Sequence, residues 1–281
     1  MLNEPTEQMW IFALISPFIA NFCLYIFCQT CGKRDNSWVD AMWGIMFCLP
    51  NAVLLAMRGA DDITPRMWLI SVPVFLWGVR LAVYILIRHK SEDYRYKEMR
   101  LGWEAKGDCF YYFAAFMFVA VMQALFSLIT NSSVIFVNLY SSVYDSPPLG
   151  WSDYVGVAMW ALGFLIEVAS DSQLATHLKS PKPGAGKFCK EGFWRYSRHP
   201  NYFGEAVMWW GLFVIALAEE YGWATFYSAL FINLCIRFLS GVPFGEKKYK
   251  ENPEWQQYCR ETNVFCLWRY VKVEQTMISG S

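Results

Sequence analysis

The sequence predicts an all-α fold: a polytopic membrane helix bundle with about seven transmembrane helices. Hydrophobic residues make up 56% of the 281 residues and charged residues 17%, whereas a soluble domain is about a quarter charged. The charged residues gather between long apolar runs, each near the ~20 residues that cross a bilayer as a helix. This separation into blocks indicates that lipid surrounds much of the chain.

Seven apolar runs are long enough to span a membrane. We expect one membrane domain over residues 1–281, with a C-terminal tail at 241–281. Polar and β-branched residues at 132–144 are expected to form an extramembrane connection. The predicted spans are residues 9–28, 39–57, 67–87, 109–130, 154–170, 202–218 and 223–240.

The basic residues test this segmentation independently. Loops on the cytoplasmic side of a membrane carry an excess of Lys and Arg. Of the 24 basic residues, 20 fall in alternate loops and in the tail. The tail is therefore expected on the cytosolic or matrix side. Formal net charge is zero, so nothing in the charge balance favours a nucleic-acid partner. Three histidines and cysteines placed mostly in apolar runs predict no metal site.

Acidic residues inside the predicted spans point to a polar cavity. An ionisable group at the bilayer centre costs ~2.5–3.5 kcal/mol on insertion scales, so it usually faces a partner or water. Glu167 and Asp171 lie one helical turn apart on one face, and Glu167 is a candidate catalytic carboxylate. Asp40 lies near the end of its span, where an interfacial position is sufficient to explain it.

The densest polar chemistry precedes the sixth predicted span. Pro200 favours a helix start, which places Arg198 and His199 where backbone N–H groups attract an anion. Arginine can hold phosphate through two bonds. Asn201 can bind an amide, and Tyr196 and Tyr202 offer stacking faces. These residues fit a nucleotide pocket, and they equally fit an ordinary basic and aromatic interface belt. No soluble nucleotide-binding motif is present.

Several motifs, in order and at plausible spacing over about residues 35–268, resemble the DUF1295 family of the steroid 5-alpha-reductase-like superfamily, which also includes isoprenylcysteine methyltransferases. They are Asp40-x-x-Trp43-Gly44, Trp77-x-x-Arg80-Leu81, Glu92-Asp-Tyr-Arg-Tyr96, Glu167-x-x-x-Asp171-x-Gln173, Gly192-Phe-Trp-Arg-Tyr-Ser-Arg-His-Pro-Asn-Tyr-Phe-Gly-Glu205, Trp209-Trp210-Gly211, Ser240-Gly-Val-Pro243, Glu246-Lys-Lys-Tyr249 and Tyr258-x-x-x-Thr262.

The resemblance implies an NADPH site at the cytosolic mouth of the bundle. Reduction of an enone also needs an acid or hydrogen-bond donor near the carbonyl. A tyrosine on an earlier helix does this in steroid reductases, and Tyr84 and Tyr96 are the candidates here. The expected cofactor-binding residues are Asp171, Gln173, Lys179, Tyr196, Arg198, His199, Asn201, Tyr202, Glu205 and Glu246.

Three functions fit these observations. The first is an NADPH-dependent oxidoreductase that acts on a CH–CH group of a lipophilic unsaturated substrate, such as a steroid or an enoyl lipid. The second is a methyltransferase that uses S-adenosylmethionine, because the ending from Glu246 to Tyr258 is closer to the methyltransferases. The third is a reductase-like structural or lipid-binding subunit of a larger membrane complex. All three place the chain among membrane lipids, in the endoplasmic reticulum or the mitochondrial inner membrane.

Overall fold

The computed structural model describes residues 5–179 and 186–267. Within these residues the secondary structure is helical and contains no β-strand, apart from one isolated parallel bridge between Ser197 and Asn263. The all-α prediction is therefore confirmed. The chain divides into two compact units. The first is Met1–Ala158 with Trp210–Phe231, and the second is Met159–Trp209 with Ile232–Ser281. Each unit is described by itself, and the single membrane domain stays a prediction.

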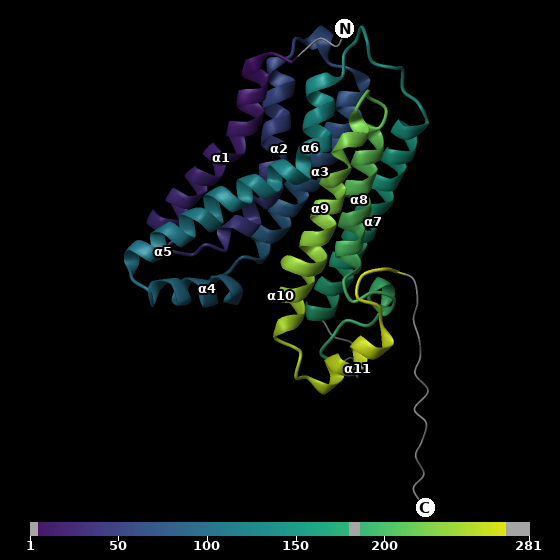
Figure 1. Cartoon of the computed structure of the whole chain (residues 1–281). Helices are drawn as coiled ribbons and strands as arrows, with labels where there is room; N and C mark the ends of the chain where they lie inside the picture. Colours follow the sequence, from purple (N-terminus) through teal and green to yellow (C-terminus); the bar gives the residue numbers. More distant parts are fainter. Residues whose placement is uncertain (1–4, 180–185, 268–281) are drawn as a thin grey trace, which may run out of the picture. The chain divides into compact units, whose positions relative to one another are not determined.

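Long helices make up most of both units (Figure 1). The residues between α5 and α6 form a π-helical turn, Phe116–Met122, so that these helices run on as one 33-residue stretch. The α-helices are α1 (Glu7–Thr30), α2 (Trp38–Met57), α3 (Pro65–Arg88), α4 (Tyr94–Glu104), α5 (Asp108–Ala115), α6 (Gln123–Tyr140), α7 (Trp151–Lys179), α8 (Pro200–Ala216), α9 (Tyr227–Leu234), α10 (Gly241–Lys247) and α11 (Pro253–Glu261).

Six helical stretches are long and apolar enough to cross a membrane, among the residues described. A seventh predicted span corresponds to α8, which has 17 residues, so about seven spans agree with the structure. The chain is an integral membrane protein. The six stretches are Glu7–Thr30, Trp38–Met57, Pro65–Arg88, Asp108–Tyr140, Trp151–Lys179 and Gly222–Lys247.

One predicted connection is helical in the structure. Residues 132–144 were expected outside the membrane, but α6 continues through most of them. Their polar groups have partners on other helices of the first unit: Ser133 shares a hydrogen bond with Ser228 at 2.8 Å, and Asn138 Nδ2 donates to Asn51 Oδ1 at 3.0 Å. Interhelical bonds of this kind let polar side chains lie within a membrane bundle. The local sequence cannot show that these partners exist.

Outward-facing apolar side chains explain how the first unit meets lipid. Ile19 of α1 is 58% exposed and Leu76 of α3 is 54% exposed. In a membrane protein, lipid tails cover exposed apolar side chains of this kind on the spanning helices. The expected contact with membrane lipids follows from these faces.

Small residues set the helix packing that carries the candidate site in the second unit. A Cβ atom on Gly163 of α7 would meet the backbone of Gly204 and Met208 in α8, and a Cβ atom on Gly204 would meet the backbone of Gly163 and Glu167. Glycines at a helix interface allow this close approach of two backbones. The contact holds the Glu167–Asp171 face of α7 directly against α8.

Candidate functional site

A tight turn opens the polar segment that leads into α8 in the second unit. Gly192 has φ of +57°, a region that favours glycine. A Cβ atom there would also collide with the side-chain amide of Gln173. Glycine therefore lets Gln173 Oε1 accept the Phe193 N–H at 3.0 Å. Nearby, Trp194 Nε1 donates to the Ser170 carbonyl at 2.9 Å. These two bonds fix the turn to α7.

The C-terminal segment fixes the same turn from another direction. The backbone N–H of Arg198 donates to the Asn263 carbonyl at 2.8 Å. The hydroxyl of Tyr258, on α11, donates to the backbone carbonyls of Trp194 and Ser197. Tyr258 is 2% exposed. Hydrogen bonds to α7 and to residues 258–263 thus fix the segment that leads into α8.

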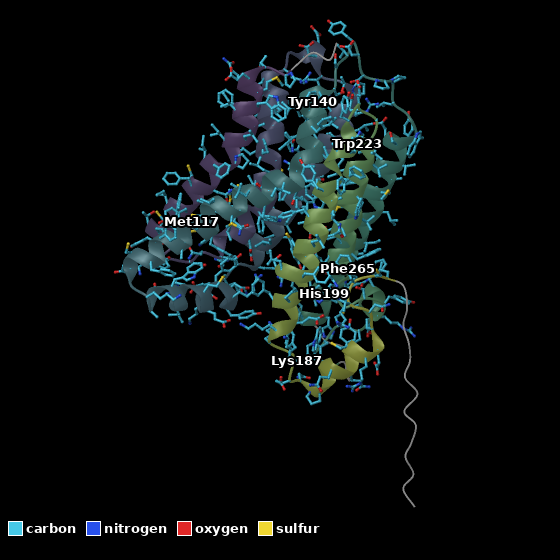
Figure 2. The ribbon with its side chains drawn as sticks, viewed as in Figure 1. Met117, Tyr140, Lys187, His199, Trp223 and Phe265 are labelled. Atoms are coloured by element: carbon cyan, nitrogen blue, oxygen red, sulfur yellow. The ribbon has the colours of Figure 1, made fainter. Side chains whose placement is uncertain are left out.

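Glu246 joins the two basic residues that precede α8. Arg198 Nε donates to Glu246 Oε1 at 3.0 Å, and its Nη1 donates to the Thr262 carbonyl at 2.8 Å. His199 Nε2 lies 2.9 Å from the same carboxylate oxygen. Figure 2 labels His199 and Phe265, and the ring of Phe265 lies 6.1 Å from that of Phe203 on α8. Arg198 therefore organises this end of the unit, and its predicted contact with a phosphate stays a prediction.

Burial keeps His199 neutral at physiological pH. Loss of solvation lowers the pKa of His199 below its usual value, and the positive charges of Arg198 and Arg237 act in the same direction. The hydrogen bond to Glu246 opposes this effect without overcoming it. A neutral ring that donates from Nε2 leaves Nδ1 as an acceptor. The ring of Tyr202 stacks on the imidazole, with centroids 5.3 Å apart and planes at 8°.

Asn201 carries an acceptor that no described residue satisfies. Its Nδ2 donates to Asp171 Oδ1 at 3.3 Å, and this bond fixes the orientation of the amide. Its Oδ1 is buried without a hydrogen-bond partner, as is Ser170 Oγ on α7. Buried polar atoms usually have partners, and each exception needs an explanation. A ligand N–H or O–H donor that reached either atom would supply the missing partner.

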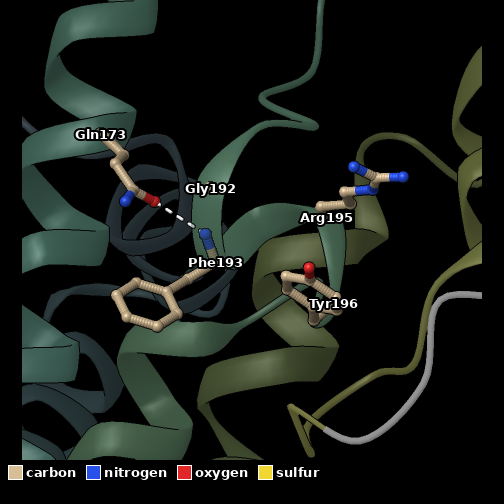
Figure 3. Close-up of a pocket in the computed structure, with 5 residues that line it drawn as sticks. All are labelled: Gln173, Gly192, Phe193, Arg195 and Tyr196. Carbon is tan, nitrogen blue, oxygen red and sulfur yellow. Dashed lines mark hydrogen bonds between the residues drawn. The ribbon is translucent and has the colours of Figure 1, made fainter.

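An open pocket lies beside this cluster in the second unit (Figure 3). Its volume is about 290 Å³, at the low end of the ~300–1,000 Å³ range of small-molecule sites. Gln173 and Tyr196 were expected in the site, whereas Arg195 was missed. The sequence offered one signal for Arg195, its position in the same basic and aromatic segment. The lining residues are Gln173, Gly192, Phe193, Arg195 and Tyr196.

The remaining second-unit candidates lie on the same two helices. Glu167 and Asp171 are buried in α7. Glu205 lies one turn after Asn201 on α8 and therefore shares its face. Lys179 is exposed at the end of α7. The structure thus brings together the candidates around Asp171 and Asn201, while Lys179 lies two turns further along.

Tyr96, a candidate catalytic residue, belongs to the first unit. Its hydroxyl donates to Asp40 Oδ1, and Arg95 Nη2 donates to Asp40 Oδ2 at 2.7 Å. Arg95 Nε is held in turn by Asp93 at 2.9 Å. Burial and the adjacent Asp40 carboxylate raise the pKa of Tyr96 well above its usual value. The phenol therefore keeps its proton, as a hydrogen-bond donor must. The sequence explained Asp40 as an interfacial residue and missed this pairing.

Tyr84, the second candidate donor, has a different environment. Its hydroxyl accepts a hydrogen bond from Arg88 Nη1 at 3.0 Å near the end of α3. The guanidinium groups of Arg88 and Arg80 lie 5.1 and 5.6 Å from its ring centroid. The hydroxyl of Tyr84 thus accepts from a cation, whereas that of Tyr96 donates to a carboxylate, and both tyrosines stay predicted donors.

Comparison with known proteins identifies relatives of the chain. The model of the family described as "Protein of unknown function (DUF1295)" matches residues 26–262. The chain is 31% identical over 102 residues to the Bos taurus protein named 3-oxo-5-alpha-steroid 4-dehydrogenase 1, covering 36% of this chain and 38% of that protein. It is 33% identical over 118 residues to the Homo sapiens protein of the same name, covering 42% and 39%. The chain thus spans less than half the length of these curated relatives. No solved structure matches it.

Proposed function

Because the chain belongs to the DUF1295 family, whose model covers most of it, we propose that it is a membrane-embedded, NADPH-dependent reductase. Its proposed substrate is lipophilic and unsaturated, such as a steroid or an enoyl lipid. The observation that carries the proposal is the Asn201 amide: Asp171 fixes it, and its buried oxygen lacks a partner. The similarity to two steroid dehydrogenases supports the same class of reaction.

The residues around Asn201 would hold the nicotinamide end of the cofactor. Asn201 Oδ1 would accept a hydrogen bond from the carboxamide N–H of the cofactor. Ser170 Oγ, which is also buried without a partner, would bind a ribose hydroxyl. The neutral His199 ring and the Tyr202 ring stacked on it offer an acceptor and an aromatic face. Glu205 lies on the same face of α8 as Asn201, and it is proposed as a further cofactor-binding residue. The bound cofactor would supply the hydride, a chemistry that belongs to the cofactor itself.

Tyr96 would serve the carbonyl of the substrate. Addition of a hydride to a conjugated C=C bond places negative charge on the carbonyl oxygen, and a proton then completes the reduction at the neighbouring carbon. A fixed hydrogen-bond donor at that oxygen lowers the barrier. The one hydroxyl proton of Tyr96 is donated to Asp40 in the structure, so the substrate carbonyl would replace Asp40 as its acceptor. Tyr84 and Glu167 also stay predicted catalytic residues.

Ligand-dependent melting tests the proposal. A ligand that binds the native state at 100 times its dissociation constant adds about 2.7 kcal/mol of stability. We expect NADPH to raise the melting temperature of the full chain in detergent, and S-adenosylmethionine to leave it unchanged. Asn201→Ala should abolish the NADPH effect, whereas Gln256→Ala, an exposed substitution on α11, should not.

Other outcomes would assign the other functions. A shift with S-adenosylmethionine alone would overturn the reductase in favour of a methyltransferase. No shift with either ligand, together with co-purification in a large assembly, would favour a reductase-like subunit of a membrane complex. Consumption of NADPH in the presence of an enone lipid would then measure turnover directly.

The membrane that holds the chain is proposed to be the endoplasmic reticulum or the mitochondrial inner membrane. In either membrane, the basic loops and the C-terminal tail, which together hold 20 of the 24 basic residues, would face the cytosol or the matrix. Imaging of a C-terminally tagged chain against markers of both organelles distinguishes them. A location in neither membrane would overturn this part of the proposal.

A further inference from the structure

Most carboxylates around α4 of the first unit already have basic partners. In residues 33–40 and 88–108, six acids each lie within 3.3 Å of an arginine or of His89. The arginines of these pairs are turned partly inward, with side chains that are only 19–32% exposed. Their charges and those of the acids cancel within this surface. The six acids are Asp35, Asp40, Glu92, Asp93, Glu104 and Asp108.

The lysines of the same region are exposed instead, and none of the four forms an ion pair with a residue that the structure describes. Only two acids of the region are exposed, Glu98 and Asp108, and Asp108 already pairs with Arg34 at 3.3 Å. The outer surface is therefore positive, although the region as a whole is close to neutral. We call these four lysines the basic rim: Lys33, Lys90, Lys97 and Lys106.

Two ion pairs bring the segments that carry the basic rim to one end of the first unit. His89 Nε2 lies 3.2 Å from Asp35 Oδ2, so the loop after α1 packs against the end of α3. Arg34 Nη1 lies 3.1 Å from Glu104 Oε1, so the same loop also reaches the end of α4. Figure 1 shows α4 running across the direction of α2 and α3 at this end. The four lysines therefore belong to one surface.

The basic rim adjoins side chains that lipid tails cover. The 24 residues of α3 make about 36 Å of helix at 1.5 Å per residue, more than the ~30 Å hydrocarbon core. The end of α3 therefore reaches the headgroup layer. Ile87 in its last turn is 75% exposed, and Lys90 follows closely. At the start of α5, Lys106 Nζ lies 4.7 Å from the ring centroid of Phe110, which is 39% exposed.

We propose that the basic rim binds the phosphate headgroups of anionic phospholipids in the adjoining leaflet. A lysine near a membrane surface favours an anionic lipid by about fivefold in affinity, and its flexible stem lets the ammonium group follow a mobile headgroup. The apolar side chains beside the lysines favour a lipid over a soluble anion, because a lipid also covers them. The proposal goes beyond the proposed function and needs neither a cofactor nor turnover.

Thermal unfolding of the full chain in a neutral detergent tests the proposal. Dioctanoyl phosphatidylglycerol should raise the melting temperature, because a ligand of the native state adds stability. Dioctanoyl phosphatidylcholine should need at least about fivefold more lipid for the same rise. An increase in ionic strength from about 0.1 to about 1 M shortens the screening length from ~10 to ~3 Å, so it should reduce this preference.

Two matched variants separate charge from shape. A variant with Lys33→Gln, Lys90→Gln, Lys97→Gln and Lys106→Gln should lose the preference for phosphatidylglycerol. A variant with arginine at the same four positions keeps the charge and should keep the preference. The melting temperature of each variant without added lipid shows that it is folded. The double variant Lys90→Gln with Lys97→Gln serves if the fourfold glutamine variant is not folded, and it should show a partial loss.

Four results would overturn the proposal. The first is an equal response of the wild-type chain to both lipids. The second is an unchanged preference in the glutamine variants, and the third is an equal loss in the arginine variant, since the effect would then not depend on charge. The fourth is an equal rise in melting temperature with glycerol phosphate at the same concentration. That compound has the phosphate without the tails, so the surface would then bind a free phosphate and not a lipid.

Discussion

Arg66 and Asp153 form an ion pair that is almost completely buried in the first unit. Arg66 Nε donates to Asp153 Oδ1 at 2.8 Å, and the side chains are 2% and 0% exposed. Arg66 Nη1 also reaches Glu219 Oε1 at 2.8 Å. The pair ties the starts of α3 and α7 to the loop after α8. Arg66 is one of the few basic residues on the face opposite the basic loops, and here it has a structural role.

Removal of one partner from this ion pair should destabilise the fold strongly. Arg66→Met leaves two buried carboxylates without a cation, and loss of one member of a buried pair costs about 3–5 kcal/mol. Chemical unfolding in detergent measures the loss. The matched control is Lys190→Gln, because Lys190 pairs with Glu254 at 3.5 Å while both side chains are 34% exposed. Exposed pairs contribute about 0–1 kcal/mol. Equal losses in both variants would contradict the prediction.

The membrane fold could be predicted from the sequence because each signal is local. A helix that spans lipid satisfies its own backbone, so an apolar run of the right length is sufficient to mark it. Side-chain pairing is not local. Asp40 was explained as an interfacial residue because its partner Tyr96 lies 56 positions away. Likewise the sequence could not show the partners of Arg198, because Glu246 and Thr262 lie 48 and 64 positions away.

The polar stretch at the end of α6 was predicted to be a connection for the same reason. Ser133 and Asn138 resemble loop residues when only their neighbours are considered. Their partners Ser228 and Asn51 lie 95 and 87 positions away. Motif spacing did better at the site, because Asp171 and Asn201 each lie in a motif, and the structure joins them by a hydrogen bond.

Loss of the Tyr96 hydroxyl should reduce turnover without reducing cofactor affinity. General acid or hydrogen-bond catalysis contributes about 10²–10⁴-fold to rate, so Tyr96→Phe should lower kcat within that range. Cofactor titration should give an unchanged dissociation constant, since Tyr96 is not among the proposed NADPH-binding residues. Tyr94→Phe is the control, because Tyr94 lies on the same helix and is 41% exposed.

Asp40 should affect turnover through the phenol of Tyr96, to which it is hydrogen-bonded. Asp40→Asn keeps the shape of the acceptor but removes the charge that Arg95 and Tyr96 share. A partial loss of kcat is expected, smaller than that of Tyr96→Phe. Full activity of Tyr96→Phe would remove Tyr96 from the mechanism and return Tyr84 as the candidate donor.

His199 should make stability fall as the pH is lowered below about 6.5. Its pKa is lowered in the folded chain by burial, whereas the unfolded chain titrates near the ordinary value of about 6.5. Between the two pKa values the unfolded state binds more protons, so the free energy of unfolding rises with pH across this window. Above pH ~6.5 both states carry a neutral ring and the contribution is constant.

The substitution His199→Gln should flatten this part of the pH profile. Denaturant unfolding of the wild-type and variant chains at a series of pH values from 5 to 7.5 in matched buffers, a range of about 2.5 units around the ordinary histidine pKa, gives two curves. Their difference isolates His199 from the carboxylates that titrate in both. Parallel curves would show that the folded chain does not disfavour the imidazolium ion.

Tyr258 should stabilise the site from a distance. Its hydroxyl donates to the carbonyls of Trp194 and Ser197, which flank the turn that carries Arg195 and Tyr196. Tyr258→Phe keeps the ring in its apolar cluster and leaves buried acceptors short of a donor, at a cost of about 1–3 kcal/mol. We expect a lower melting temperature, faster amide exchange in the turn and weaker NADPH binding. Tyr249→Phe, in the same aromatic cluster, removes a hydroxyl that makes no hydrogen bond among the described residues, and it should change none of the three. Normal exchange in the turn of Tyr258→Phe would show that α7 alone holds it.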